Sequence, residues 1–190
     1  MKTIGVLALQ GAVAEHLDKL EQIGTAGKKV RTINELQQID GLIIPGGEST
    51  AIGKLLDDFA LTEPLEKLIK DGLPVWGTCA GMILLAKRIC GQEKTYLNAM
   101  DISVRRNAYG GQLDSFITTC QIPAIASGKL PLVFIRAPYI QDIGKTVKIL
   151  AEVGENIVAA RQDNMLVTSF HPELTHVDDF HKYFRQMCCQ

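Results

Sequence analysis

The sequence predicts an α/β fold: a mostly parallel, doubly wound sheet with antiparallel strands added in its C-terminal half. Two observations support this prediction. Up to about residue 77, short and almost wholly apolar runs alternate with stretches of helical period, which is typical of parallel strands buried on both faces. From about residue 101, apolar and polar residues alternate along the chain and no long helical stretch intervenes, which favours shorter, partly antiparallel strands.

The first half contains the parallel part of the predicted sheet. We expect strands at residues 3–9, 28–33, 41–44 and 74–77, and helical segments at residues 12–23, 35–39, 49–59 and 64–70. In the first helix, Val13, Leu17 and Leu20 recur at helical spacing. Gly24 then supplies a stop signal. The other segments follow from the same alternation of apolar runs and helical periods.

The second half contains the antiparallel part. We expect strands at residues 101–105, 112–122, 132–136, 146–153, 157–161 and 165–170, and a closing helix at residues 178–187. Asp163 and Asn164 form a hairpin turn between the last two strands. No linker, repeat or low-complexity segment interrupts the pattern, so we expect one domain over residues 1–190.

The bulk composition excludes several classes of partner. The net charge of −1 provides no basic surface for nucleic acid. No apolar run approaches the roughly 20 residues that span a bilayer, so we expect no membrane partner either. The chain runs directly into a strand pattern without a signal peptide, which predicts a cytoplasmic protein.

The cysteines and most of the histidines carry no predicted chemistry. The five cysteines have neither CxxC nor metal-type spacing, so we expect no disulfide framework and no metal site. We also expect no cofactor. Cys188 and Cys189 are expected on a frayed terminus. His16, His176 and His181 are expected to be solvated on helix faces or near the terminus.

A candidate nucleophile follows the last strand of the first half. That strand runs into Gly77-Thr78-Cys79-Ala80-Gly81, and a helix-forming run comes next. This is the pattern of a nucleophile elbow with cysteine in place of serine, in which flanking glycines permit a sharp turn. The turn places Cys79 at the positive end of the helix dipole and leaves the N–H of Ala80 free for an oxyanion. Taken alone, Cys79 is also compatible with a small buried hydrophobic side chain.

A glycine-containing loop follows the strand that ends at residue 44. Its sequence is Pro45-Gly46-Gly47-Glu48-Ser49-Thr50. Such a loop at a strand end can bind an anion through its backbone N–H groups, and the N–H of Gly47 is a candidate second oxyanion donor beside Cys79. The alternative is a plain tight turn in which Ser49 or Thr50 caps the next helix.

A candidate base and acid follow the last strand. Pro172 favours an extended conformation at His171, in which His171 and Glu173 project to the same side. The carboxylate of Glu173 can then orient the imidazole toward a thiol, which predicts a Cys79–His171–Glu173 triad. The alternative is a histidine whose hydrogen bonds are satisfied at a strand end, next to a solvated glutamate. The three segments all follow apolar strands, where open α/β sheets place their sites.

These motifs resemble the class I, triad-type glutamine amidotransferases. Within that class, the chain is similar to the glutaminase subunits of pyridoxal 5′-phosphate synthases over essentially its whole length. The further segments that carry the resemblance are Leu9-Gln10-Gly11-Ala12-Val13, Arg106-Asn107, Asp114-Ser115-Phe116 and Phe134-Ile135-Arg136-Ala137-Pro138. The resemblance implies a three-layer, flavodoxin-like fold that hydrolyses L-glutamine to glutamate and ammonia. It also implies that a separate (β/α)₈ synthase subunit receives the ammonia.

The resemblance also implies roles for individual residues. It makes Cys79 the nucleophile, His171 the general base and acid, and Glu173 its orienting partner. It assigns the glutamine site to Gly47, Glu48, Ser49, Arg106, Ile135 and Arg136. It places Gln10 near the oxyanion site, together with Gly47 and Ala80. Without the resemblance, the sequence does not show which of Arg105 and Arg106 belongs to the glutamine site.

One departure and three alternatives remain. Gly111 stands where the family usually has arginine, which puts one partner-facing or loop contact in doubt. The alternatives are another cysteine-nucleophile α/β hydrolase, an amidotransferase with a different acceptor, and a non-catalytic glutamine-sensing subunit. An intact Cys79, His171 and Glu173 argues against the last of these.

Overall fold

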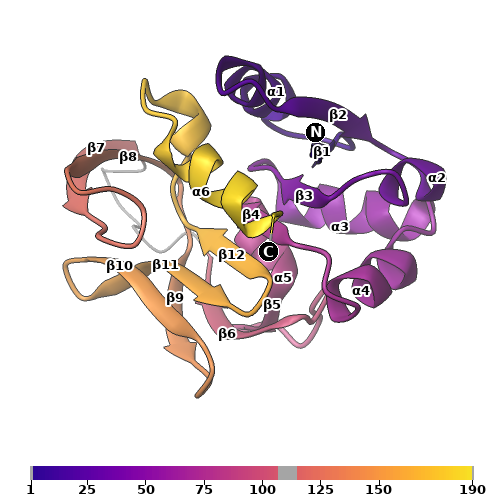
Figure 1. The fold of residues 1–190 in the computed structure, drawn as a ribbon. Helices are drawn as coiled ribbons and strands as arrows, with labels where there is room; N and C mark the ends of the chain where they lie inside the picture. Colours follow the sequence, from indigo (N-terminus) through magenta and orange to yellow (C-terminus); the bar gives the residue numbers. More distant parts are fainter. Residues whose placement is uncertain (1, 107–114, 190) are drawn as a thin grey trace.

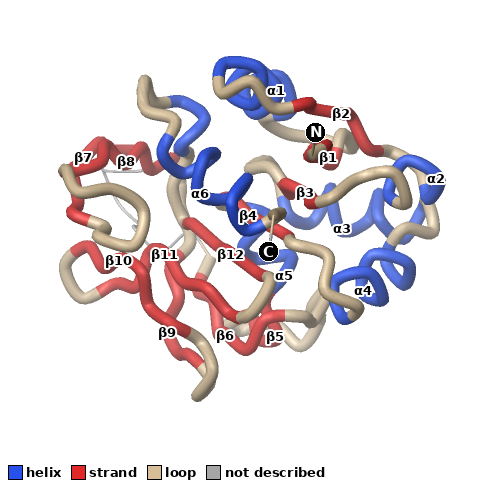
Figure 2. The backbone as a smooth tube through the Cα atoms, viewed as in Figure 1, coloured by secondary structure: helices blue, strands red, loops and turns tan. Residues whose placement is uncertain are grey.

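The main sheet of the molecule confirms the predicted α/β class. The computed structural model of the chain describes residues 2–106 and 115–189. Within these residues, a ten-stranded sheet runs through the molecule, and helices cover both of its faces (Figures 1 and 2). Among the described helices, none has the length and apolar character needed to cross a membrane.

The parallel half of the sheet is the part that the sequence pattern described best. In spatial order its strands are β2 (Ala26–Val30), β1 (Thr3–Leu7), β3 (Gly41–Ile44), β4 (Val75–Thr78) and β12 (Met165–Thr168). Each pair of neighbours is parallel. In β3, Ile43 contributes to one apolar cluster while Leu42 and Ile44 contribute to the cluster on the opposite face. Burial on both faces is the reason these strands read as continuous apolar runs.

The C-terminal strands extend the sheet beyond β12. They follow in the order β11 (Asn156–Gln162), β9 (Tyr139–Ile143), β6 (Met100–Arg105) and β5 (Ala86–Ile89). β10 (Lys148–Val153) also pairs with β11, outside this order. The links from β12 to β11, from β11 to β9 and from β9 to β6 are antiparallel, as the alternating pattern predicts.

Three details of this half differ from the expectation. β7 (Ser115–Gln121) and β8 (Lys129–Ile135) do not extend the main sheet but form a separate two-stranded one. β9 was not anticipated. β5 begins at Ala86, where a helical run was expected, because the chain leaves the helix early and pairs in parallel with β6. Tertiary pairing therefore overrides the local helical preference of that segment.

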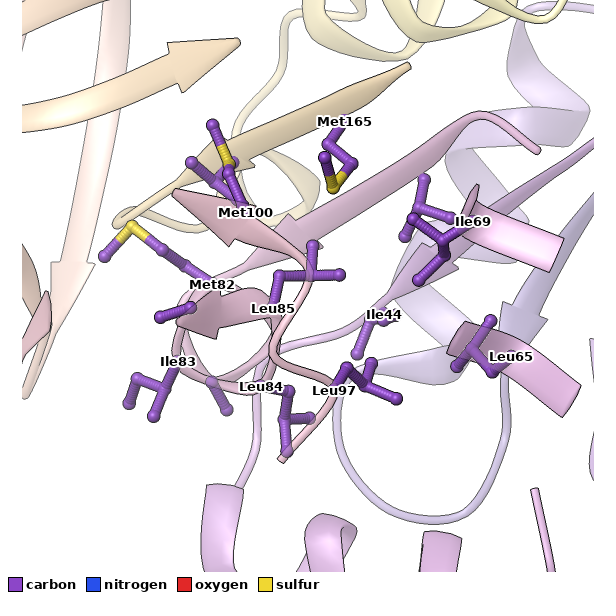
Figure 3. Close-up of a cluster of buried hydrophobic side chains, with 14 of the residues drawn as sticks. Ile44, Leu65, Ile69, Met82, Ile83, Leu84, Leu85, Leu97, Met100 and Met165 are labelled. Atoms are coloured by element: carbon purple, nitrogen blue, oxygen red, sulfur yellow. The ribbon is translucent and has the colours of Figure 1, made fainter. Parts of the chain in front are cut away.

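The two faces of the sheet carry different helices. α1 (Val13–Gln22) and α6 (Asp179–Met187) lie over one face, where Trp76 of β4 packs against Phe180 of α6 at a ring distance of 6.3 Å. The other face carries α2 (Ile33–Leu36), α3 (Ser49–Asp58), α4 (Thr62–Lys70) and α5 (Ala80–Leu85). Figure 3 shows the centre of that second cluster, where Leu84 and Leu85 of α5 lie near Ile44 and Leu97.

The end of α6 is more deeply buried than expected. Cys188 is buried against Gly41 at the start of β3, and a side chain at that glycine would collide with the cysteine sulfur. Burial raises the pKa of the Cys188 thiol to about 12. The expectation of a frayed terminus was therefore wrong for Cys188, because α6 carries it into the core, whereas Cys189 is exposed.

Candidate active site

The carboxyl ends of β3, β4 and β12 open into a cleft of about 560 Å³. These three strands are neighbours in the sheet and parallel, so the segments that follow them emerge at one edge. Nearly all the site residues expected from the sequence line this cleft: Gln10, Gly47, Glu48, Ser49, Cys79, Ala80, Arg106, Ile135, Arg136 and His171. Glu173 is buried behind His171.

Cys79 sits on a strained turn between β4 and α5. Its backbone angles are φ 48° and ψ −100°, and a non-glycine residue rarely adopts a positive φ. The glycines on either side leave no room for side chains: a Cβ at Gly77 would lie 2.5 Å from the backbone of Gly81, and one at Gly81 would collide with the carbonyl oxygen of Ile44. The N–H of Cys79 donates to the carbonyl of Thr168 at 2.8 Å, which ties the turn to β12.

His171 lies between the thiol of Cys79 and the carboxylate of Glu173. Its Nδ1 lies 2.7 Å from Oε1 of Glu173. That bond requires the proton on Nδ1, so Nε2 is the nitrogen available to the sulfur. A Cβ at Gly46 would meet both the His171 ring and Cβ of Cys79, so the glycine allows imidazole and thiol to approach each other. The structure therefore brings the three predicted triad residues together.

The backbone that joins His171 to Glu173 differs from the expectation. An extended segment was predicted to project the two side chains to the same side. Instead, Pro172–Leu174 forms a 3₁₀ turn, and the carboxylate of Glu173 lies at the edge of the ring, beside Nδ1. Proline at the first position of the turn fits this geometry, because its fixed φ is helical and it has no N–H to leave unsatisfied.

The charges within the triad favour an imidazolium. Burial by itself would lower the pKa of His171, but its hydrogen bonds with Cys79 and Glu173 and their charges outweigh burial and raise its pKa to about 10. Burial opposes ionisation of Glu173, yet the imidazoles of His16 and His171 hold its pKa below the usual range. A buried carboxylate beside an imidazolium is the electrostatic arrangement that supports a thiolate nucleophile.

The glycine loop lines the cleft beside the triad. The carbonyl oxygen of Gly46 accepts from the N–H of Ala12 at 3.0 Å, and Oε1 of Gln10 accepts from the N–H of Glu48 at 2.8 Å. The side-chain oxygen of Gln10 therefore stabilises the loop by accepting this hydrogen bond. Ala80 is the first residue of α5, a position whose N–H has no partner within the helix.

Charged groups gather at the mouth of the cleft. Arg106 lies 3.1 Å from Oε1 of Glu48, whose other oxygen accepts from the N–H of Ala51 at 2.8 Å and so caps α3. The neighbouring Arg105 instead donates to Gln141 at 3.0 Å, and it does not line the cleft. Of the two neighbouring arginines, the structure therefore places Arg106 and not Arg105 at the cleft. Asn107, Gly111 and Asp114 lie outside the described residues.

The polar groups around Ile135 and Ser49 complete the lining. Sγ of Cys79 lies 4.0 Å from the carbonyl oxygen of Ile135, at the end of β8. Arg136 follows with a φ of 42° and is exposed. Oγ of Ser49 is buried at the cleft and has no hydrogen-bond partner among the described residues. A buried hydroxyl without a partner is suited to a ligand that supplies one.

Two histidines beside the triad were missed. His16 and His181 were expected in solvent, but both are fully buried, with Nδ1 of His16 2.9 Å from Nε2 of His181. Nε2 of His16 faces Oε2 of Glu173 at 3.5 Å. The signal available in the sequence was the phase of α1: His16 precedes Leu20 by four residues, and so lies on the same buried face. Nowhere in the part of the chain that the structure describes do three potential ligands gather to hold a metal.

Comparison with known proteins gives consistent results. The profile of the SNO glutamine amidotransferase family matches residues 6–190. A protein of Ruminiclostridium cellulolyticum named pyridoxal 5′-phosphate synthase subunit PdxT is 58% identical over 188 residues, covering 98% of this chain and 100% of its own length. A protein of the same name from Clostridium acetobutylicum is 56% identical, with coverage of 97% and 99%. A crystal structure described as a glutamine amidotransferase superimposes with a TM-score of 0.93 at 41% identity, covering 98% of this chain and 99% of that one.

Proposed function

Because the chain belongs to the SNO glutamine amidotransferase family, we propose that its cleft is the glutaminase site of a pyridoxal 5′-phosphate synthase. The protein hydrolyses L-glutamine to glutamate and ammonia and supplies the ammonia to the synthase. The single observation that carries the assignment of residues is the contact of Cys79, His171 and Glu173 at the head of the cleft.

The geometry supports a two-step covalent mechanism. The Cys79 thiolate attacks the side-chain amide carbon of glutamine, and the N–H of Ala80 faces the oxyanion that forms, with Gly47 and Gln10 as the other proposed contributors. The imidazolium of His171 gives its proton to the amide nitrogen, which leaves as ammonia, and a γ-glutamyl thioester remains. His171 then takes a proton from water, the hydroxyl attacks the thioester, and glutamate leaves as the Cys79 thiolate and the His171 imidazolium are restored.

The mouth of the cleft suits the zwitterionic end of glutamine. The α-carboxylate requires a cation and the α-ammonium an acceptor, and Arg106 lies beside Glu48 at 3.1 Å. Arg136 adds a second cation at the rim, next to Ile135. The unpartnered hydroxyl of Ser49 can bond the substrate deeper in the cleft. Partial burial alone would raise the pKa of Glu48, but backbone N–H bonds and Arg106 lower it, so the carboxylate stays ionised.

The proposed activity is tested by supplying the chain with glutamine, with and without its synthase partner. We expect glutamate and ammonia in equal amounts and no product from asparagine or simple esters. A preference for an ester would favour another cysteine hydrolase. Binding of glutamine without turnover, even with the partner present, would favour a sensing subunit.

Arg106 and Arg105 provide a matched pair of variants. Replacing Arg106 with glutamine is expected to raise the KM for glutamine at least ~10-fold, since removing a charge-assisted hydrogen bond costs about 1.5–3 kcal/mol. The same change at Arg105 is expected to leave KM within about twofold, because that side chain bonds Gln141 outside the cleft. Steady-state glutamate release measures both values, and equal KM values for the two variants would remove Arg106 from the substrate site.

The finer partner assignment is also a proposal. We expect the receiving subunit to be a (β/α)₈ barrel, because the resemblance to the glutaminase subunits of these synthases implies it. We also expect the protein to act in the cytoplasm. All five cysteines of the chain are free, which fits a reducing compartment.

A further inference from the structure

The second oxygen of the Glu173 carboxylate has a neighbour that the triad does not account for. Oε1 is paired with His171, whereas Oε2 is buried without a normal hydrogen bond to any described residue. Nε2 of His16 faces Oε2 at 3.5 Å, and the same nitrogen lies 3.3 Å from Oγ1 of Thr78, so its N–H is shared between the carboxylate and the hydroxyl. The side chains of His16 and Glu173 are both fully inaccessible to solvent. A buried carboxylate that stays ionised needs a donor on its second oxygen as well.

Hydrogen bonding determines which nitrogens carry protons in this cluster. If His16 donates from Nε2 toward Glu173, its Nδ1 must accept, and the atom 2.9 Å from Nδ1 is Nε2 of His181. His181 then carries its proton on Nε2, which leaves its Nδ1 bare. That atom is buried without a partner among the described residues. Leaving an unprotonated acceptor unpaired costs less free energy than leaving a donor unpaired. The contact of His16 with Glu173, its contact with His181 and the unpaired Nδ1 of His181 therefore all agree with Nε2 of His16 as the donor.

We propose that His16, oriented by His181, is a positioning residue for the triad, whose N–H holds Oε2 of Glu173. The proposal rests on the proposed function, since it assigns the carboxylate an orienting role in that site. His16 does not line the cleft, so it acts through Glu173 and not on the substrate. Catalytic hydrogen bonds are often long in the free enzyme and shorten in the reacting complex, so the 3.5 Å separation fits a contact that closes when the substrate is bound.

A neutral donor is what this position requires. A cation such as lysine would pair with Glu173 and compete with His171 for its charge. Burial lowers the pKa of His16, and burial, followed by the influence of His16 and Lys19, lowers the pKa of His181 to about 2. Both directions favour the uncharged rings that this chain of hydrogen bonds requires. The edges of both rings contact Trp76, with ring distances of 5.6 Å for His16 and 4.9 Å for His181, which limits their rotation.

The ionisable groups around His16 come from three elements. Glu173 and His171 face it from the end of β12, and His181 faces it from α6. On α1 itself, Glu15 lies near, and Lys19 is paired with Asp178 at 3.0 Å. Because Lys19 is neutralised by that pair, the group that responds most directly to loss of the His16 N–H is Glu173.

The test compares His16→Asn with His16→Gln in the full chain assayed with its synthase partner. The glutamine amide nitrogen can reach the place of Nε2, whereas that of asparagine lies near the place of Nδ1. We expect His16→Asn to lower kcat by about 10- to 100-fold and to move the acidic limb of the kcat/KM profile upward by about one pH unit, since a hydrogen bond to a charged group is lost. His16→Gln should restore most of the lost kcat and most of the original position of the acidic limb. The KM for glutamine should stay within about twofold of wild type in each variant.

Leu20→Ala is the matched control for stability. Leu20 is buried on the same helix and does not touch Glu173, so this variant should melt at a lower temperature with an unchanged pH profile. If both His16 variants behave like Leu20→Ala, the role is structural and the proposal fails. The rate of Cys79 alkylation can also be measured against pH by quantifying the peptide that contains Cys79. This measurement does not depend on turnover of glutamine. A wild-type chain that releases no glutamate would refute the proposed function, and the alkylation profiles would still decide the role of His16.

Discussion

Replacing Cys79 with alanine is expected to abolish glutamine hydrolysis, with a loss of kcat of about 10⁴-fold or more. Without the sulfur no thioester can form, and the remaining groups only bind the substrate. The fold should persist, since alanine keeps the Cβ and the strained backbone of the turn. Glutamate release measures the first effect, and the melting temperature measures the second.

Cys90 provides the control for this substitution. Its sulfur lies 3.3 Å from the side chain of Gln141, outside the cleft, so Cys90→Ala should retain wild-type turnover. A glutamine analogue with an electrophilic carbon should label Cys79 in the wild type and in Cys90→Ala. Turnover by Cys79→Ala above a few per cent of wild type, or labelling at another cysteine, would contradict the assignment of Cys79 as nucleophile.

Gly81→Ala is expected to lower the free energy of unfolding by about 3 kcal/mol or more. The new Cβ would collide with the carbonyl oxygen of Ile44, which is backbone and cannot rotate away. Ile44 ends β3 and leads directly into the glycine loop, so relief of the collision would also displace the wall of the cleft. We therefore expect a loss of activity even at temperatures at which the variant remains folded.

Urea unfolding of Gly81→Ala and Gly128→Ala isolates the steric cause. A Cβ at Gly128 would meet nothing within 4 Å, so that variant should change stability by no more than about 0.5 kcal/mol. Similar unfolding midpoints for the two variants would show that the elbow can relax around an added methyl group, and that the close approach of Gly81 to β3 is not essential.

The elements that were predicted correctly are those whose signal is local. β1, β3 and β4 are apolar on both faces, and α3 and α4 show helical periods, so their neighbours in the chain already distinguish strand from helix. The elbow could be recognised for the same reason, because its glycines flank Cys79 within five residues.

The elements that were missed depend on partners distant in the chain. β5 is a strand because β6 lies beside it, although its own residues follow a helical run. β7 and β8 show the same alternation as the strands that join the main sheet, but they pair only with each other. Alternation of apolar and polar residues predicts that a segment is a strand, but it does not predict which strand pairs with it.

By itself, the sequence determined the α/β class, the segments that end at the cleft and the residue types that the chemistry requires. Their catalytic roles remain predictions. Only the tertiary structure decided that a 3₁₀ turn, and not an extended strand, joins His171 to Glu173, that Arg106 and not Arg105 reaches the cleft, and that His16 and His181 are buried behind the carboxylate. The physical reason is the range of the interactions: strand and helix periods come from residues a few positions apart, whereas burial and hydrogen bonding of a polar side chain depend on which distant elements pack around it.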